Sequence, residues 1–280
     1  SHLQAISRVI NSKNALPILD CFLFELEDGT LSVTVSDSET TMVTTVEVNE
    51  SDTNGRFAVV AKTLLDAHIF HPWEGGEGKV PGQYQFARVE LAKKALEAGN
   101  YSQAIPLLEE CLEYPHHLGE GKLYGAQEND FYYFMGCAYE GLGQSDKAAE
   151  CWEQAIVGPT EPAAAMYYND AKPDKIFYQG LALLKLGRMD EANGRFHKLT
   201  SYGEKHLFDK IKMDYFAVSL PDLLIWEDDL TIRNVIHCKY MMALGYWGLN
   251  QKEKSVRLLG EVEKLDINHQ GIQAFRSLIG

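Results

Sequence analysis

The chain has 280 residues, of which 45% are hydrophobic and 24% charged, a composition normal for a folded globular protein. It carries 26 Lys and Arg residues against 40 Asp and Glu, a formal net charge of −14, and such a surface repels the phosphates of nucleic acid and of anionic lipid. No apolar run reaches the length of about 18 residues that a membrane-spanning helix needs, and no signal peptide is visible, so a cytoplasmic location is expected.

The first quarter of the chain carries the signals of a small α+β segment. Apolar and β-branched stretches predict strands at residues 21–26, 31–35, 42–48 and 57–60. Asp28-Gly29 and Asn54-Gly55 lie between them and favour tight turns, because glycine accepts positive φ. Short helices are predicted at residues 3–10 and 61–67.

These residues resemble the start of the β subunit of bacterial DNA polymerase III, the sliding clamp. The stretches that carry the resemblance are residues 3–10 (LQAISRVI), 16–19 (LPIL), 28–33 (DGTLSV), 36–40 (SDSET) and 55–59 (GRFAV). In that family each subunit has three similar domains, and two subunits form a ring around DNA. The resemblance implies that Lys13, just ahead of the Leu-Pro-Ile-Leu turn, takes a position that faces DNA in the family.

Much of a clamp subunit has no counterpart in this chain. The first strand of the family's first domain is missing upstream, and the other two domains and the protein-binding cleft are missing downstream. A ring cannot close from such a piece, so residues 1–68 are interpreted as an incomplete fragment without full clamp activity. Because sheet neighbours are absent, we expect unpaired strand edges through which the piece can pair with another chain.

The hydrophobic pattern changes at about residue 68. Residues 71–76 have the composition of a loop, and from residue 84 onward apolar residues recur at the 3.6-residue period of α-helices. The sequence therefore divides into a clamp-like segment at 1–68, a linker at 69–83 and a helical part at 84–280.

An internal repeat organises the helical part, and residues 132–159 hold its clearest unit. The unit reads Tyr132-x2-Met135-Gly136-x2-Tyr139, then Ala148-x3-Trp152, then Pro159, which resembles the tetratricopeptide pattern W-x2-L-G-x2-Y…A-x3-F…P. The small residues let the two helices of a pair approach, and the large aromatic residue fills the space between successive pairs.

The same frame recurs four times along the chain, with turn residues Gly99, Gly143, Gly187 and Asn250. The first two steps are 44 residues and the last is 63, against about 34 for a plain unit, so the last gap should hold a further helix or two. The predicted fold is mostly α: a tetratricopeptide-like α-solenoid of about four helix pairs, preceded by the small incomplete α+β segment. A short helix at 270–279 is expected to cap the last repeat, which has no neighbour.

Residues 70–280 also resemble the C-terminal helical region of a bacterial family of unknown function, in which a galactose mutarotase-like β-sandwich precedes tetratricopeptide repeats. The stretches that carry this are residues 71–79 (HPWEGGEGK), 114–115 (YP), 118–123 (LGEGKL), 167–170 (YYND), 177–182 (FYQGLA) and 212–222 (KMDYFAVSLPD). The resemblance implies a link to carbohydrate metabolism. The sandwich is absent here, so any sugar chemistry housed in it is lost.

Possible catalytic and ligand-binding motifs have simpler structural interpretations. The loops at residues 76–79 and 119–122 lack the first glycine and the Ser or Thr of a phosphate-binding loop, so we interpret them as loops that lead into helices. The nine histidines form no zinc motif, and His206-x2-Asp209 lacks a third ligand. Glu227-Asp228-Asp229 suits the start of a helix near Leu230. No catalytic residues, cofactor or metal are predicted.

The cysteines and aromatic residues complete the candidates. With no C-x-x-C, the cysteines are expected to be free thiols in a reducing compartment; they are Cys21, Cys111, Cys137, Cys151 and Cys238. Aromatic side chains that face the inner groove of the repeats would contact a peptide or a sugar ring. The candidate partner-binding residues are Tyr168, Asn169 and Asp170 in a linker between repeats, with Tyr133 and Tyr178.

We interpret the chain as a non-enzymatic tetratricopeptide-repeat scaffold that binds a peptide, a protein or a glycan-related partner in the groove of its stacked helix pairs. One alternative is an accessory part of a carbohydrate-active protein, with Asp170, Glu227 and Asp229 as the carboxylates to consider. The other is a sliding-clamp fragment of DNA replication, although the acidic composition makes nucleic acid a poor partner.

Overall fold

The computed structural model describes residues 21–27, 30–36, 41–47, 55–60, 78–122, 124–164, 170–211 and 229–279. The chain divides into two compact units, Ser1–Phe70 and His71–Gly280. The helices predicted at residues 3–10 and 61–67 lie outside the described residues.

The first unit contains an antiparallel four-stranded sheet, and its strands are those that the sequence predicts. They are β1 (Cys21–Glu27), β2 (Thr30–Ser36), β3 (Thr41–Glu47) and β4 (Gly55–Val60). Their order is β3-β2-β1-β4, and Leu26 pairs with Leu31 next to the β1–β2 connection. In the described part of this unit, β3 and β4 each pair on one side only, which leaves two outer edges.

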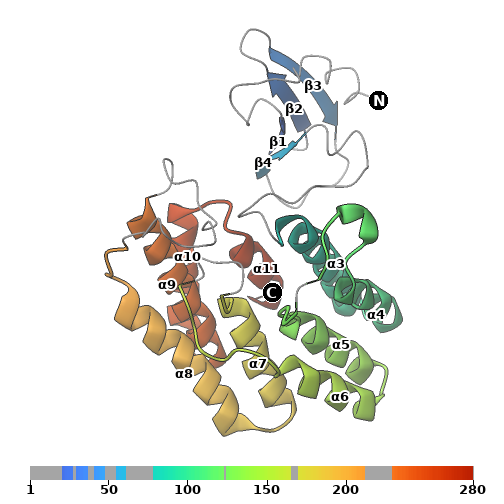
Figure 1. Cartoon of the computed structure of the whole chain (residues 1–280), viewed down its shortest axis with the longest axis vertical. Helices are drawn as coiled ribbons and strands as arrows, with labels where there is room; N and C mark the ends of the chain where they lie inside the picture. The colour runs from blue at the N-terminus through green and yellow to red at the C-terminus, as the bar shows by residue number, and fades with distance from the viewer. Residues whose placement is uncertain are drawn as a thin grey trace. The chain divides into compact units, whose positions relative to one another are not determined.

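The described residues of the second unit form four consecutive helix pairs and a final helix, which confirms the predicted solenoid (Figure 1). The first helix of each pair is called an A helix: α3 (Lys79–Glu97), α5 (Asn129–Gly141), α7 (Pro173–Lys185) and α9 (Leu230–Gly248). The second is a B helix: α4 (Tyr101–Glu109), α6 (Ser145–Ala155), α8 (Met189–His206) and α10 (Lys252–Leu265). The final helix is α11 (Gln270–Ile279).

The helical part begins earlier than the predicted residue 84. Helix α3 starts at Lys79, so the predicted linker at 69–83 was too long by five residues. Pro81 is compatible with this start because a helix's first-turn N–H groups have no partner within the helix. Between α4 and α5 the chain forms two single 3₁₀ turns, η3 (Glu110–Leu112) and η4 (His116–Leu118).

The turn inside each pair has one geometry, which explains the recurring glycine. After α5, the Gln144 N–H donates to the Tyr139 carbonyl at 2.9 Å and the Gly143 N–H to the Glu140 carbonyl at 2.9 Å. This is a Schellman turn, and it requires a left-handed residue, here Gly143 at φ 73°. The equivalent residues have φ values of 74°, 75° and 58°, and they are Gly99, Gly187 and Asn250. Asparagine tolerates this conformation better than other non-glycine residues, so the fourth turn keeps the frame.

Small residues on the A helices face large ones on the B helices, as the repeat pattern predicts. A Cβ added to Gly136 would lie 2.2 Å from Nε1 of Trp152, and one added to Gly180 would lie 2.3 Å from Cε1 of Phe196. The residue seven positions before the left-handed turn residue is small in all four repeats: Ala92, Gly136, Gly180 and Ala243. Five residues after each turn it is small and buried: Ala104, Ala148, Ala192 and Ser255. Close helix approach within every pair follows from this frame.

The long step to the fourth repeat does not interrupt the stacking. Phe196 of α8 is fully buried and also lies against Gly245 and Gly248 of α9. Gly203 of α8 lies against Met242 of α9 in the same way. Part of the extra length is α8 itself, which extends over 18 residues. The further helix predicted in the gap falls mainly on residues 212–228, outside the described residues.

Helix α11 is the predicted cap, but it reaches further than the last repeat. Its Ile272 and Phe275 side chains are buried in the core of the last repeats. The helix also contacts the first repeat, since Lys93 Nζ of α3 donates to the Ala274 carbonyl. Figure 1 shows α11 near the middle of the helical unit, between α3 and α9. None of the helices in the described ranges is long and apolar enough to cross a membrane.

Candidate functional site

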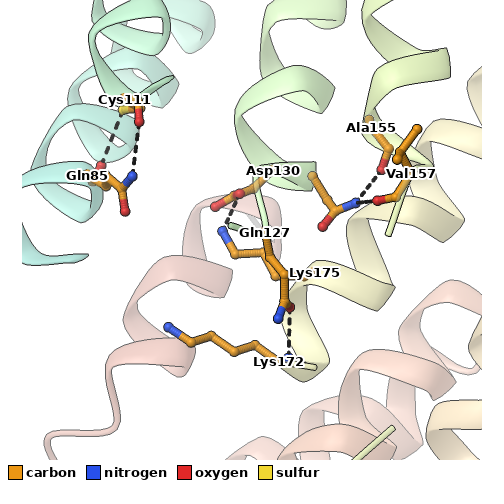
Figure 2. Close-up of polar contacts among 9 residues, drawn as sticks. Gln85, Cys111, Gln127, Asp130, Ala155, Val157, Lys172 and Lys175 are labelled. Carbon is orange, nitrogen blue, oxygen red and sulfur yellow. Dashed lines mark hydrogen bonds and ion pairs between the residues drawn. The ribbon is translucent and has the colours of Figure 1, made fainter. Parts of the chain in front are cut away.

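The A helices α5 and α7 are joined by a buried ion pair. Asp130, in the first turn of α5, accepts a hydrogen bond from Lys175 of α7, and Figure 2 shows the two side chains pointing toward one another. Their side chains are only 12% and 11% exposed. Lys175 Nζ also lies 4.7 Å from the centre of the Phe131 ring. The pair therefore connects the second and third repeats on their A-helix side.

The protonation of this pair follows from burial and from a second carboxylate. Burial raises the pKa of Asp130, and Lys175 opposes that rise. Burial alone would lower the pKa of Lys175, but the carboxylates of Asp130 and Asp174 together raise it. The ammonium thus keeps its proton and satisfies Asp130. The Lys175 ammonium and the Asp130 carboxylate neutralise each other, so the pair suits a structural link rather than acid–base catalysis.

Side-chain amides at the start of α5 hold the linkers between repeats in place. Gln127 donates to the Asp170 carbonyl at 3.0 Å and accepts from the Lys172 N–H at 3.1 Å, a contact visible in Figure 2. Asn129 donates to the carbonyls of Ala155 and Val157, both at 2.8 Å. The linker that carries the predicted residue Asp170 is therefore anchored by its backbone where it enters α7.

The aromatic residues predicted as contacts differ in their exposure. Tyr133 and Phe134 of α5 and Tyr178 of α7 form a cluster with ring centroids 5.3 to 5.5 Å apart. Tyr178 is only 6% exposed, and burial raises its pKa well above the usual value. Its place in the core leaves little surface for a partner, so we do not retain it as a contact residue. Tyr133 is half-buried between α5 and α7.

Four candidate residues lie outside the described residues: Lys13, Tyr168, Asn169 and Glu227. Asp170 is half-buried. Asp229 is the N-cap of α9, where its carboxylate accepts from the N–H groups of Thr231 and Ile232, as expected for an acidic group at a helix start. This use removes Asp229 as a candidate for a pair of catalytic carboxylates.

The remaining motifs have structural roles where they are described. The Gly78 N–H donates to the Glu120 carboxylate, and Lys122 pairs with Glu128, so the two glycine-rich loops brace each other and the start of α5. No group of three potential metal ligands occurs among the described residues. Burial raises the pKa of the Cys111 thiol to about 12, with a smaller contribution from Asp130, so it is a poor nucleophile at neutral pH.

The contacts of α11 define a surface on the A helices, where the sequence predicted a groove but not that this helix occupies it. We call it the inner face: the side of the A helices against which α11 packs, marked by Lys93 of α3, Phe177 of α7, and Tyr240 and Trp247 of α9. The sequence feature that could have indicated this surface is Lys93, a basic residue next to Ala92 in the apolar stripe of α3. It is only 3% exposed.

A histidine caps the N-terminal end of α11. The Ile272 N–H donates to Nδ1 of His269 at 3.3 Å, and the His269 ring lies 4.6 Å from the ring of Tyr240. Burial lowers the pKa of His269, while Asp266 and Asp174 act against that shift. The neutral imidazole is therefore favoured in the folded chain, and only a ring nitrogen without a proton can accept this hydrogen bond.

Acidification is expected to loosen α11. A folded-state pKa below the unfolded value gives stability that is present above about pH 6.5 and lost as pH falls through the folded-state value. His269→Asn keeps a capping oxygen that does not titrate, and a cap is worth about 1 kcal/mol. Urea denaturation at pH 7.5 and pH 5.5 should show a larger loss for the unchanged chain than for His269→Asn.

His237 provides the internal reference for that measurement. Nε2 of His237 is hydrogen-bonded to the Ala163 carbonyl at 2.8 Å, and burial lowers the pKa of His237 as well. His237 is present in the unchanged chain and in His269→Asn, so its contribution cancels when the two losses of stability are subtracted. Equal losses in the two chains would assign the pH dependence to His237 or to carboxylates and not to the cap of α11.

Comparison with known families supports the two-part description. Residues 1–69 match the model of the DNA polymerase III beta subunit, N-terminal domain, and residues 130–156 match that of the tetratricopeptide repeat. Among solved structures, MamA 41-end from Desulfovibrio magneticus RS-1 is 15% identical; the match covers 68% of this chain and 77% of that chain, with a TM-score of 0.26. That score is too low for the likeness to carry an argument. The chain thus joins a part similar to the clamp's N-terminal domain to helix pairs of which one is similar to a tetratricopeptide repeat.

Proposed function

We propose that the helical unit binds a polypeptide partner on the inner face of its A helices. The observation that carries this proposal is that the face already holds a polypeptide helix, α11. The repeat frame sets four A helices next to one another, and such a surface suits an extended or helical ligand. No bond-making step is part of this function.

The proposed contacts combine the inner face with the neighbouring linker. Tyr133 and Asp170 are retained from the sequence prediction, because both are half-buried and lie next to α7. Tyr168 and Asn169 remain predictions. Lys93, which holds the α11 backbone, is added from the structure.

A peptide-display selection on the immobilised full chain tests this function. In a chain that carries Phe275→Ala, which weakens the hold of α11 on the face, enriched peptides are expected to lose about tenfold or more in affinity, roughly 1.4 kcal/mol, when Lys93→Ala is added. The reason is that the ammonium that holds a main-chain carbonyl is removed. Asp170→Asn is expected to weaken those peptides that reach the linker. Fluorescence anisotropy with labelled peptides measures both.

Variants on the B helices provide the matched control. Met189→Ala on α8 and Val256→Ala on α10 change side chains that are 57% and 50% exposed on B helices. Peptide affinity should be unchanged in these two variants. A selection whose peptides respond to Met189 or Val256 but not to Lys93 would place binding on the B-helix side and reject the proposal.

A further inference from the structure

Helix α11 lies where a ligand of the inner face would lie. The Phe275 ring makes edge contacts with Phe177 of α7 at 5.5 Å and with Trp247 of α9 at 5.2 Å. Gly271 lies against the Tyr240 ring so closely that an added Cβ would be 2.5 Å from it. Contacts on α3, α7 and α9 mean that one short helix covers A helices from the first, third and fourth repeats.

The described surface of α11 has a buried side and a solvent-exposed side. Ile272 and Phe275, three residues apart, are 4% and 2% exposed, whereas Gln270 and Gln273 are exposed. Residues three apart lie on the same face of a helix. The inner face thus recognises a small residue, a β-branched residue and a phenylalanine at helical spacing.

In the described part of the chain, two polar contacts join α3 to α11. The side-chain amides of Gln83 and Gln270 are 3.4 Å apart, whereas the Lys93 contact does not depend on a side chain of α11. Lys93 Nζ donates to the Ala274 carbonyl and to Glu90 Oε1, the latter at 2.6 Å, and lies 5.8 Å from the Phe134 ring centre. A main-chain carbonyl is present on any helix, so another helix can satisfy the same ammonium. The flexible stem of lysine also lets its charge reach water when the helix leaves.

The attachment of α11 permits it to leave. Helix α10 ends at Leu265 and α11 begins at Gln270, and in the connection between them Ile267 is 74% exposed. An isolated helix of about ten residues is not stable in water, so α11 is held by the inner face rather than by its own hydrogen bonds. Release of α11 leaves the tight Gly–aromatic contacts within the helix pairs in place.

We propose that the inner face is the binding site for an amphipathic helix of a partner protein, and that α11 occupies this site in the same chain until the partner displaces it. This inference rests on the proposed polypeptide-binding function and names the partner's chemistry. The partner helix carries an aliphatic β-branched residue, a phenylalanine three positions later, and a small residue just before the pair. The C-terminal helix then acts as an intramolecular competitor.

A labelled peptide with the sequence of residues 266–280 serves as the probe, added to the full chain and followed by fluorescence anisotropy. Phe275→Ala in the chain weakens the competitor and leaves the inner face intact, so this variant should bind the unchanged peptide about tenfold tighter or more. Val256→Ala should bind it as the unchanged chain does. The same peptide with alanine in place of its phenylalanine should bind neither.

Hydrogen exchange of the unchanged chain gives a readout that does not depend on a variant. Amides of α11 should exchange through a local opening, well before those of α7. The proposal is overturned if α11 exchanges only with global unfolding, or if a folded Phe275→Ala chain binds the peptide no tighter than the unchanged chain. Phe275-dependent dimers in light scattering would instead assign the site to α11 of a second copy and likewise overturn it.

The two proposals can fail separately. Display-selected peptides that bind the unchanged chain and Phe275→Ala equally well, and lose affinity with Lys93→Ala, would retain polypeptide binding and reject displacement of α11. In the Phe275→Ala chain, where α11 competes less, peptides whose affinity does not change when Lys93→Ala is added would reject the inner face as a binding surface altogether.

Discussion

Asp130→Ala is expected to lower the free energy of unfolding of the helical unit by about 3–5 kcal/mol. The substitution leaves the Lys175 ammonium in a site where its side chain is only 11% exposed. Burial disfavours the charged form of Lys175. The carboxylates of Asp130 in α5 and Asp174 in α7 keep it protonated. Urea denaturation followed by circular dichroism measures the loss.

A double-mutant cycle separates the pair from the packing around it. Asp130→Leu alone and Lys175→Met alone should each destabilise, because each leaves one buried charge without a partner. Asp130→Leu combined with Lys175→Met removes both charges with little change in volume and should come within about 1 kcal/mol of the unchanged chain. If the two single changes simply add in the double variant, the charges are solvated and do not join α5 to α7.

The fold could be predicted from the sequence because its repeat rests on steric requirements that few residues meet. A Schellman turn needs a left-handed residue, and Gly99, Gly143, Gly187 and Asn250 all supply one. Close approach within a pair needs a small residue opposite a large one, as with Gly136 and Trp152. The strands were predictable for a similar reason, since alternation over residues 30–36 fits one face of a sheet.

The candidate site could be predicted only in part, because it depends on contacts between residues far apart in the chain. Tyr133 and Tyr178 look alike in the repeat pattern, yet Tyr178 lies in the core between repeats while Tyr133 keeps some exposure. The apolar spacing of Ile272 and Phe275 indicates an amphipathic helix but not where it docks. That location is set by the curvature of the solenoid, which brings Lys93 next to a carbonyl 181 residues away.

The same curvature explains why the cap reaches the first repeat. A helix that covered only the last pair would contact α9 and α10, where the next repeat would stack. Helix α11 contacts Trp247 and Tyr240 of α9 from the inner face instead, and so comes within reach of Phe177 and Lys93. One helix can therefore act as a cap and occupy the binding surface, which links stability of the solenoid to access to its inner face.

Gly180→Leu is expected to lower the free energy of unfolding by about 3 kcal/mol. A Cβ at this position would lie 2.3 Å from Phe196 Cε1, and a Cβ at Gly248 of α9 would lie 2.3 Å from Cδ1 of the same ring. The ring is fully buried, so it has little room to move aside. Phe196 thus fills the space between the A helices of two repeats, and separating α7 from α8 would open the fully buried core around it. Urea denaturation of the purified variant measures the effect.

Gly194→Ala is the matched control, since it changes a glycine of α8 whose added Cβ would meet no atom within 4 Å. It should stabilise the unit by about 0.5–1 kcal/mol, because alanine is favoured over glycine inside a helix. Adding Phe196→Leu to Gly180→Leu replaces the ring with a smaller side chain. This double variant should recover part of the lost stability, because the total side-chain volume is closer to the original. Equal effects of Gly180→Leu and Gly194→Ala would mean that helix propensity, and not the close contact of α7 with α8, determines the role of these glycines. The repeat frame would then lose its physical basis.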